Sequence, residues 1–327
     1  MEKAPIWITV YDRPEHFRSC VESLAKNPEA LDTTLYISSD GPLDDISAEK
    51  VIKVRDYIKS ISGFKRIISF LPKINTNSEI KQKAYNELRS NHSRYIHTED
   101  DNIFSVVALN YFNNGLDIYE ERDEIIAVSG YMYPGFPAQH CEQVFLQCVA
   151  SWGLALWRDK DLAPSFDEKA LSSEALTDRD LFRKINRILP NSSPMIKAIS
   201  EGRLKAGDIT RSIYAIKHSK YSVHPSISVV RNIGHDGSGE NCGVSDLFDT
   251  QEICTREITF NLAKPIKVSS LDQKWVSTFM GGWFAQVHGW LIFLRFNANN
   301  ISSRAFYQGL LKVYGFAYRV RQFVRQI

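Results

Sequence analysis

Short β-rich runs alternate with helical patterns over the first 130 residues of the chain. Each run of residues such as Ile, Val, Leu and Tyr is followed by a segment in which apolar side chains recur every three or four positions. The predicted strands and helices are, in order, Ile6–Tyr11, Pro14–Ala25, Leu35–Ser38, Ser47–Ile61, Phe64–Phe70, Ser78–Ser90, Tyr95–Thr98, Ser105–Tyr119 and Ile125–Ser129. This rhythm indicates βαβ units, and therefore an α/β fold with a mostly parallel sheet flanked by helices.

The pattern becomes irregular after residue 130. Aromatic and glycine-rich segments occur at 130–135 and 151–153. A strand-like run then covers Tyr221–Val230 and leads into Asn232–Gly239, where three glycines permit tight turns and exposed backbone N–H groups. The second half of the fold, over 131–262, is therefore expected to be rich in loops.

The composition agrees with a folded globule. The chain has 327 residues, 43% of them hydrophobic, which allows one large core or a core with a smaller appendage. A formal net charge of +2 gives no indication of nucleic-acid binding. The five cysteines show neither a Cys-x-x-Cys spacing nor the density of a disulfide scaffold, and the amino terminus lacks a secretory pattern. We therefore expect a protein of a reducing, cytoplasmic compartment.

The carboxy-terminal segment 263–327 has a different character. From Gln273 to Ile327 there is no Asp or Glu, while basic residues alternate with aromatic ones. This pattern predicts a helical appendage that contacts an anionic membrane surface through 283–327, peripherally on the inner face of the cell membrane. The alternative is a helix that packs on the main domain.

Acidic residues gather at the ends of three predicted strands, in Asp12-Arg13, Asp40-Gly41 and Glu99-Asp100-Asp101. Ligands of open α/β sheets bind beyond the carboxyl ends of the strands, so these groups are expected at one edge. Hard cations such as Mg²⁺ and Mn²⁺ prefer oxygen ligands and often take only one or two protein carboxylates. Each group taken alone could also be a helix cap or a turn.

Five motifs, in this order, resemble the GT-A fold glycosyltransferases, and among them bacterial sugar transferases related to N-acetylglucosaminyltransferase I. They are Val10-Tyr11-Asp12-Arg13-Pro14-Glu15-His16, Ser39-Asp40-Gly41-Pro42, Glu99-Asp100-Asp101, Ser151-Trp152-Gly153-Leu154-Ala155-Leu156-Trp157-Arg158, and His224-Pro225-Ser226 running on to the 232–239 loop. The resemblance implies a Rossmann-like GT-A domain over 1–262. Its nucleotide-sugar half would be 1–130, and its acceptor half with a lid loop would be 131–262.

The resemblance also implies the donor contacts. Asp101 would ligate Mn²⁺ or Mg²⁺, and Asp100 would lie near the sugar or ribose, with Glu99 as a supporting residue. Arg13 would contact phosphate and Asp40 the base. The donor would be a nucleotide-sugar, with a UDP-sugar favoured. A cation is needed because the leaving nucleoside diphosphate develops negative charge.

An inverting transfer needs a carboxylate that takes the proton from the acceptor hydroxyl. Asp208 is the preferred base, because similar enzymes place an acidic residue in this part of the chain. The residues around it lack the tryptophan that commonly follows that acid, so Asp178 and Asp180 remain alternatives.

Other motif residues would hold the sugars. Trp152 and Trp157 would present flat faces to the sugar or acceptor, and Gly153 would allow close approach; the alternative for the aromatics is a place in the core. His235, Gly237 and Ser238 match a segment that in relatives folds over the donor diphosphate.

The sequence thus predicts a metal-dependent transferase that moves a sugar to a glycan or lipid-linked glycan acceptor in surface polysaccharide synthesis. Two alternatives stay open. The same acidic edge could serve a nucleotidyltransferase or phosphohydrolase, or the chain could be a non-catalytic glycan- or nucleotide-binding protein.

Overall fold

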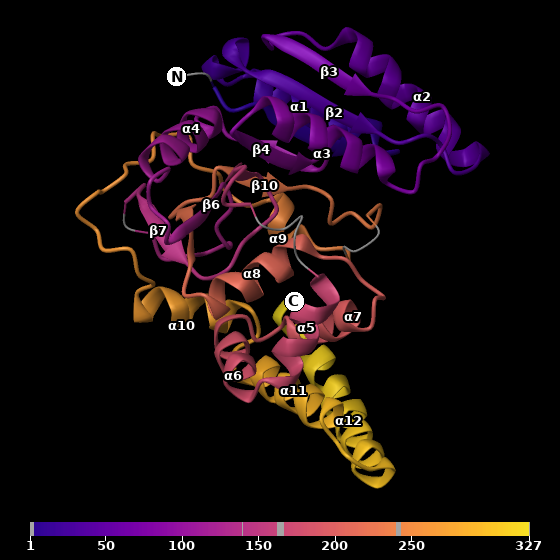
Figure 1. Cartoon of the computed structure of the whole chain (residues 1–327), viewed down its shortest axis with the longest axis vertical. Helices are drawn as coiled ribbons and strands as arrows, with labels where there is room; N and C mark the ends of the chain where they lie inside the picture. The colour runs from indigo at the N-terminus through magenta and orange to yellow at the C-terminus, as the bar shows by residue number, and fades with distance from the viewer. Residues whose placement is uncertain (1–2, 139, 162–166, 240–242, 327) are drawn as a thin grey trace. The chain divides into compact units, whose positions relative to one another are not determined.

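Eight strands form one sheet, as shown by a computed structural model that describes residues 3–138, 140–161, 167–239 and 243–326 (Figure 1). In chain order the strands are β1 (Ile6–Val10), β2 (Thr34–Ser39), β3 (Arg66–Phe70), β4 (Arg94–Glu99), β6 (Ile125–Ser129), β7 (Gln143–Leu146), β8 (Leu154–Trp157) and β9 (Tyr221–Pro225). Their order across the sheet is β3-β2-β1-β4-β8-β6-β9-β7.

The amino-terminal half of this sheet is parallel. Strand β1 lies between β2 and β4, and β2 pairs with β3, all in parallel register. Strand β8 runs antiparallel to both β4 and β6. The predicted mixed, mostly parallel α/β fold is therefore confirmed. Every residue of β1 is buried, as expected for a strand covered on both faces.

Helices flank the parallel strands, and local sequence explains where they start. In this part of the chain they are α1 (Pro14–Ala25), η1 (Pro28–Asp32), α2 (Asp45–Ser60), α3 (Glu79–Asn91) and α4 (Ala108–Ile118). Pro14 occupies the first turn of α1, where a missing N–H costs nothing. Asp44 and Ser47 form a reciprocal capping box at the start of α2. Helix α1 buries Phe17 and Leu24 against the sheet side.

The predicted strand Tyr221–Val230 is wrong as a single element. The structure divides it into β9, in the large sheet, and β10 (Val230–Asn232), which pairs antiparallel with β5 (Asn102–Phe104) in a separate two-stranded ladder. Pro225 ends β9, because proline has no N–H to continue a sheet ladder. This division brings the 232–239 loop onto the turn that follows β4.

Two compact units make up the chain. The first comprises 1–144, 150–161 and 222–265, and includes the short helix α9 (Asp246–Asp249). The second comprises 145–149, 162–221 and 266–327.

Helices dominate the second unit. They are α5 (Glu168–Thr177), α6 (Arg179–Ile188), α7 (Ser193–Ser200), α8 (Gly207–Lys217), α10 (Ser270–Phe279), α11 (Gly282–Phe296) and α12 (Ile301–Gln326). Phe182 of α6 packs on Trp290 and Phe293 of α11, with ring centroids 5.0 and 4.6 Å away. Asn186 donates to the Gln286 carbonyl at 2.8 Å.

These contacts change the expected domain division. The sequence pattern groups 162–221 with the first 262 residues, whereas in the structure this segment packs with helices from 266–327. The reason is the apolar face of α6, which a helix much later in the chain covers. The carboxy-terminal segment is helical, as expected, but it completes a unit rather than forming an appendage of its own.

Candidate functional site

The acidic triplet lies where β4 ends and turns into β5. Asp100 and Asp101 are each only 3% exposed, whereas the Glu99 side chain is exposed. The pKa of Glu99 is raised to about 7, mainly by loss of solvation and also by the negative charges of Asp101 and Asp100. The Glu99 side chain nevertheless reaches solvent, and solvent weakens the effect of burial on its charge. The turn thus presents two buried carboxylates and one exposed one.

Arg13, at the start of α1, bridges the two buried carboxylates. Its guanidinium forms a close ion pair with Asp100 through Nη2, its Nε donates to Asp100 Oδ2 at 3.3 Å, and its Nη1 lies 3.0 Å from Asp101 Oδ2. Burial raises the pKa of Asp100 to about 6, although the Arg13 charge opposes this. Burial also opposes the charge on Arg13, but the two carboxylates outweigh it and raise the pKa of Arg13. The predicted residues Arg13, Asp100 and Asp101 therefore converge on one point.

Hydrogen bonds from the end of β10 connect the 232–239 loop to the turn at Asp101. Asn232 donates through Nδ2 to Asp101 Oδ1 at 2.9 Å and to Asn102 Oδ1 at 3.2 Å. The Ile233 N–H donates to the Asp101 carbonyl at 2.8 Å. A Cβ on Gly234 would come within 2.2 Å of Asp101 Oδ2, so only glycine fits here. Asn232 was missed as a site residue, although its place at the head of the glycine-rich loop could have indicated it.

Replacing Gly234 by alanine is expected to weaken donor binding by about tenfold, because overpacking a filled site costs about 1–3 kcal/mol. Titration calorimetry with a nucleoside diphosphate would measure this loss. Gly243→Ala is the matched control, since a Cβ at Gly243 would meet nothing within 4 Å. Equal affinity of the two variants would show that the loop does not contact the donor edge in solution.

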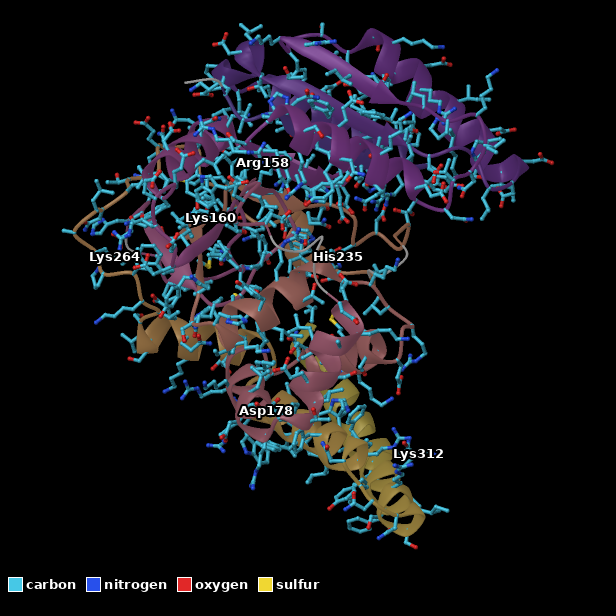
Figure 2. The ribbon with its side chains drawn as sticks, in the orientation of Figure 1. Arg158, Lys160, Asp178, His235, Lys264 and Lys312 are labelled. Carbon is cyan, nitrogen blue, oxygen red and sulfur yellow. The ribbon has the colours of Figure 1, made fainter. Side chains whose placement is uncertain are left out.

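The predicted lid residues lie along this loop, on which Figure 2 labels His235. The His235 ring packs against Phe248 and Trp152, with centroids 4.4 and 5.7 Å away. Gly237 has a φ of +88°, a conformation that favours glycine. Ser238 is exposed, and its N–H donates to Asp236 Oδ1 at 2.9 Å. His235 is thus fixed in an aromatic cluster, while Gly237 and Ser238 form the exposed turn.

This aromatic cluster contains buried polar atoms that have no hydrogen-bond partner. Trp152 packs against Tyr131 and Phe248, with centroids 4.5 and 5.1 Å away. Among the described residues, Tyr131 Oη, His235 Nε2 and Gln251 Oε1 are buried without a partner. Buried polar groups are normally paired, so the unpaired atoms of Tyr131 and His235, which both pack on Trp152, indicate a polar ligand or water. Tyr131 and Gln251 were missed, because nothing in their sequence surroundings distinguishes them.

The other two residues predicted to contact sugar have packing roles. Trp157 is 3% exposed, donates through Nε1 to the Leu116 carbonyl at 3.2 Å, and has Lys160 Nζ over its ring at 4.4 Å. A Cβ on Gly153 would come within 2.9 Å of Val230, and its φ is +66°. The structure therefore places Trp157 in the core and explains Gly153 by packing, because β8 is buried throughout.

Asp40 holds a loop of the chain itself. Its carboxylate accepts four hydrogen bonds, from the N–H groups of Gly41, Thr76 and Ser78 and from the Thr76 hydroxyl, at 2.8 to 3.1 Å. Burial opposes ionisation, but these bonds outweigh it and lower the pKa of Asp40. Arg55 donates to the carbonyls of Ser39, Asp40 and Pro72 beside it. Contact of Asp40 with the base stays a prediction, and its observed role is to shape the edge.

We expect Asp40→Asn to lower the free energy of unfolding by about 1–3 kcal/mol, because the new NH₂ group would face N–H donors. Denaturant unfolding would measure it. Asp44→Asn should be nearly neutral, since Asn and Asp cap helices equally well. The Asp40 contribution should be present at neutral pH and disappear as pH falls through its lowered pKa, so the two curves should converge in acid. A constant difference down to low pH would contradict this assignment.

The carboxylates considered as catalytic base all belong to the second unit. Asp208 lies in the first turn of α8 and is half-buried. Burial raises its pKa, although the Ile209 N–H and Arg211 oppose this. Asp178 caps α6 through the N–H groups of Asp180 and Leu181, and Asp180 pairs with Arg183 on the surface (Figure 2). Burial raises the pKa of Asp208, and this direction suits a group that accepts a proton.

The carboxylates of the same turn are also the candidate ligands of a divalent cation. Among the described residues, no group of three or more His, Cys, Asp or Glu is arranged to hold a metal ion. Asp100 and Asp101 nevertheless direct carboxylate oxygens at one cationic group, the Arg13 guanidinium. These donors fit Mg²⁺ or Mn²⁺, which in nucleotide sites takes one or two carboxylates and completes its shell with water and phosphate.

No protein-family model and no curated protein matches the chain. Solved structures do. One is TarS 1–349 of S. aureus in complex with UDP-GlcNAc, at 11% identity and a TM-score of 0.38, covering 90% of this chain and 71% of that one. Another is the mannosyltransferase PcManGT of Pyrobaculum calidifontis in complex with GDP-Man and Mn²⁺, at 11% identity and a TM-score of 0.38, covering 65% and 69%.

These structures are sugar transferases. This is the class that the motifs resemble. The chain is also similar to a second crystal structure of TarS 1–349, at 11% identity and a TM-score of 0.33. It spans about half (47%) of the length of that structure. Likeness at this distance concerns the course of the backbone, so the function is argued from the site residues.

Proposed function

We propose that this protein is a metal-dependent glycosyltransferase that uses a nucleotide-sugar donor, with a UDP-sugar favoured, and acts by inversion. The acceptor would be a glycan, or a lipid-linked glycan, in surface polysaccharide synthesis. The observation that carries the proposal is the convergence of Arg13, Asp100, Asp101 and Asn232 at the carboxyl edge of the parallel strands. Nucleotide ligands of α/β sheets bind at this edge.

The donor diphosphate needs positive charge at this edge. A bound Mn²⁺ or Mg²⁺ would offset the negative charge that develops on the leaving nucleoside diphosphate. Asp101 would hold the ion, with Asp100 beside it. The Arg13 guanidinium balances both carboxylates, and its planar fork of N–H donors also suits phosphate oxygens. Asn232 fixes the orientation of the Asp101 carboxylate through Oδ1.

The aromatic cluster suits the sugar. Trp152 offers an apolar ring, and Tyr131 Oη, His235 Nε2 and Gln251 Oε1 are polar atoms that sugar hydroxyls could satisfy. His235 directly follows Gly234, which touches Asp101, so the cluster and the acidic turn are joined through one loop. This continuity supports a sugar subsite next to the diphosphate site.

Calorimetric titration with UDP and with GDP, each with and without Mn²⁺, tests the proposal. We expect binding with a dissociation constant between about 1 µM and 1 mM that requires the metal. Analysis of turnover products then separates the alternatives. Release of a nucleoside diphosphate with sugar transfer supports the proposal, whereas pyrophosphate or monophosphate release indicates a nucleotidyltransferase or phosphohydrolase. Absence of nucleotide binding with metal present would refute the proposal.

The carboxy-terminal helices supply the proposed membrane contact. No helix among the described residues is long and apolar enough to cross a membrane. Helix α12 exposes Phe306 (61%) and Val313 (72%), and the basic side chains of Arg304 and Lys312 are also exposed. Figure 2 shows Lys312 on this helix. Basic and apolar side chains together favour an anionic bilayer surface. The side chains of 316–327, which belong to the same prediction, lie outside the described residues.

Phe306→Ser combined with Val313→Ser is expected to weaken binding to phosphatidylglycerol vesicles by at least about tenfold. Each such side chain is worth about 1.5–3 kcal/mol when fully buried, so even partial insertion of the two exceeds the roughly 1.4 kcal/mol of a tenfold change. Vesicle co-sedimentation would measure the loss. The matched control is Leu31→Ser combined with Ile52→Ser, two exposed apolar residues of the first unit. Similar binding by both double variants and the parent protein would dispose of the membrane contact.

A further inference from the structure

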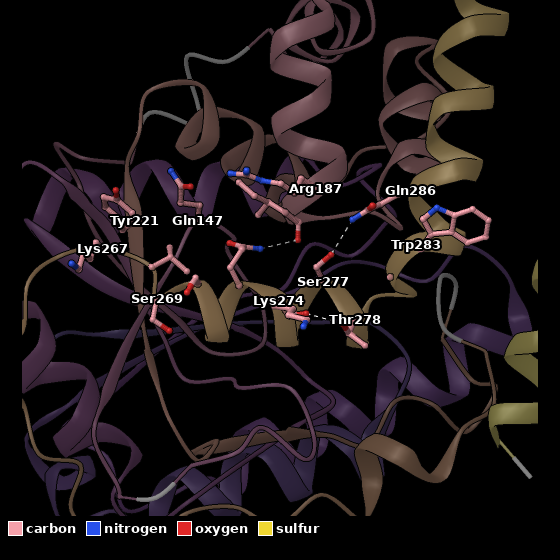
Figure 3. Close-up of a pocket in the computed structure, with 15 residues that line it drawn as sticks. Gln147, Arg187, Tyr221, Lys267, Ser269, Lys274, Ser277, Thr278, Trp283 and Gln286 are labelled. Carbon is pink, nitrogen blue, oxygen red and sulfur yellow. Dashed lines mark hydrogen bonds between the residues drawn. The ribbon is translucent and has the colours of Figure 1, made fainter.

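A cavity of about 580 Å³ lies within the second unit (Figure 3). Helices α10 and α11 form much of its wall, and the end of α6 and the segment before α10 complete it. Its volume falls within the range of about 300–1,000 Å³ that is usual for small-molecule sites. None of the residues named above for donor binding lines it, so it is a separate site.

Three basic side chains line this cavity, and no acidic side chain does so in the part of the chain that the structure describes. They are Arg187 at the end of α6, Lys267 before α10, and Lys274 on α10. Among the described residues, none of the three has a carboxylate within ion-pair distance. Like charges gathered around a hollow raise the local positive potential, which attracts an anion.

The neutral part of the wall suits a carbohydrate. Besides Tyr221 it is rich in Ser, Thr and Gln, and Trp283 lies at one end of the cavity, with Lys267 at the other (Figure 3). Trp283 is 66% exposed, so its indole face is open to a ligand. Hydroxyl and amide groups match sugar hydroxyls, and an exposed indole packs well on the apolar face of a sugar ring.

Contacts behind the wall hold it in shape without a ligand. The Gln286 carbonyl accepts from Asn186 at 2.8 Å, and a Cβ on Gly289 would come within 2.3 Å of Asn186 Oδ1, so α6 and α11 pack closely. Gln286 Nε2 reaches Ser277 Oγ only at 3.4 Å, a long hydrogen bond. The backbone of the site is therefore fixed, while its polar groups can exchange weak internal bonds for bonds to a ligand.

We propose that this cavity binds a phosphorylated carbohydrate, with the phosphate on Arg187, Lys267 and Lys274 and the sugar against Trp283. A phosphate dianion uses several cationic donors at once, which a single carboxylate of a uronic acid does not. The ligand can be a free sugar phosphate or the phosphorylated sugar headgroup of a lipid. This binding goes beyond sugar transfer from a nucleotide and does not require the donor edge.

Titration of the full chain with trehalose 6-phosphate, in the absence of nucleotide and metal, tests the proposal. Trp283 fluorescence or calorimetry would report binding, and trehalose and inorganic phosphate should each bind at least about tenfold more weakly. Lys267→Gln combined with Lys274→Gln should also weaken binding by at least about tenfold, since two charge-assisted hydrogen bonds are lost. Trp283→Ala should weaken it while leaving the fold intact, because the side chain is exposed. Lys53→Gln, an exposed lysine of α2 that belongs neither to this cavity nor to the proposed membrane contact, is the matched control.

A second arm identifies the source of the ligand. Phosphatidylcholine vesicles with and without phosphatidylinositol 4-phosphate would be compared for the same variants. Loss of vesicle binding in the double lysine variant, but not in Lys53→Gln, supports a lipid-borne headgroup. The proposal is overturned if neither trehalose 6-phosphate nor these vesicles bind, or if the cavity variants and Lys53→Gln behave alike. Because no nucleotide is present, such a failure leaves the proposed donor reaction untouched.

Discussion

Asp208→Asn is expected to lower kcat by about 10²–10⁴-fold and to leave the affinity for the donor unchanged. The reason is that a general base contributes to proton transfer and not to donor binding. Burial raises the pKa of Asp208, so activity should fall as pH decreases through this raised value. Steady-state kinetics over a range of pH, with the donor affinity measured by calorimetry, would check both parts.

The same substitution should not destabilise the fold. A carboxyl group with a raised pKa in the folded state costs stability at neutral pH, because its ionised form is disfavoured there. Asp208→Asn is therefore expected to unfold at the same or a higher denaturant concentration than the parent protein. Asp178→Asn is the control, because Asn caps a helix as well as Asp does. Full turnover in Asp208→Asn with loss in Asp178→Asn or Asp180→Asn would move the base to that residue.

Asp101→Asn is expected to weaken metal-dependent donor binding by about a hundredfold. Loss of a supporting partner of a metal ligand already costs about 10–100-fold in metal affinity, and Asp101 is the proposed ligand itself. The amide would also place a donor group near Arg13 or Asn232, where the carboxylate now accepts. Calorimetry with UDP or GDP and Mn²⁺ would measure the loss.

Glu99→Gln separates the acidic residues from one another. Glu99 is exposed and forms none of the contacts that hold Asp100 and Asp101, so its amide variant should retain donor binding within about threefold. If Glu99→Gln abolished binding and Asp101→Asn did not, the assignment of the metal ligand would be wrong. If both variants bound as the parent protein does, the edge would not be a metal site.

Much of the amino-terminal half of the fold follows from the sequence. Alternating strands and helices fix a parallel sheet, and parallel strands end at one edge, so Arg13, Asp100 and Asp101 meet as expected. Predictions of this kind need only residues that are close in the sequence. The acidic triplet could be predicted as a site because it directly follows a predicted strand.

The remainder depends on contacts between distant segments. Tyr131 and Gln251 join the aromatic cluster from loops that carry no motif, and Trp157 is a core residue although a ligand-binding role fits its motif equally well. The division of 221–230 between two sheets depends on β5, more than a hundred residues earlier. No local pattern shows which partner a strand or an apolar helix face will find.

The packing of α6 against α11 has a consequence for how the chain can fold during synthesis. Phe182 and Asn186 are buried by residues about a hundred positions later, Gln286 to Phe293. The second unit therefore cannot complete its core until α11 has left the ribosome, whereas strands β1 to β4 can already associate. A nascent chain that has reached residue 262 would expose the apolar face of α6, and would need protection from aggregation until the last helices arrive.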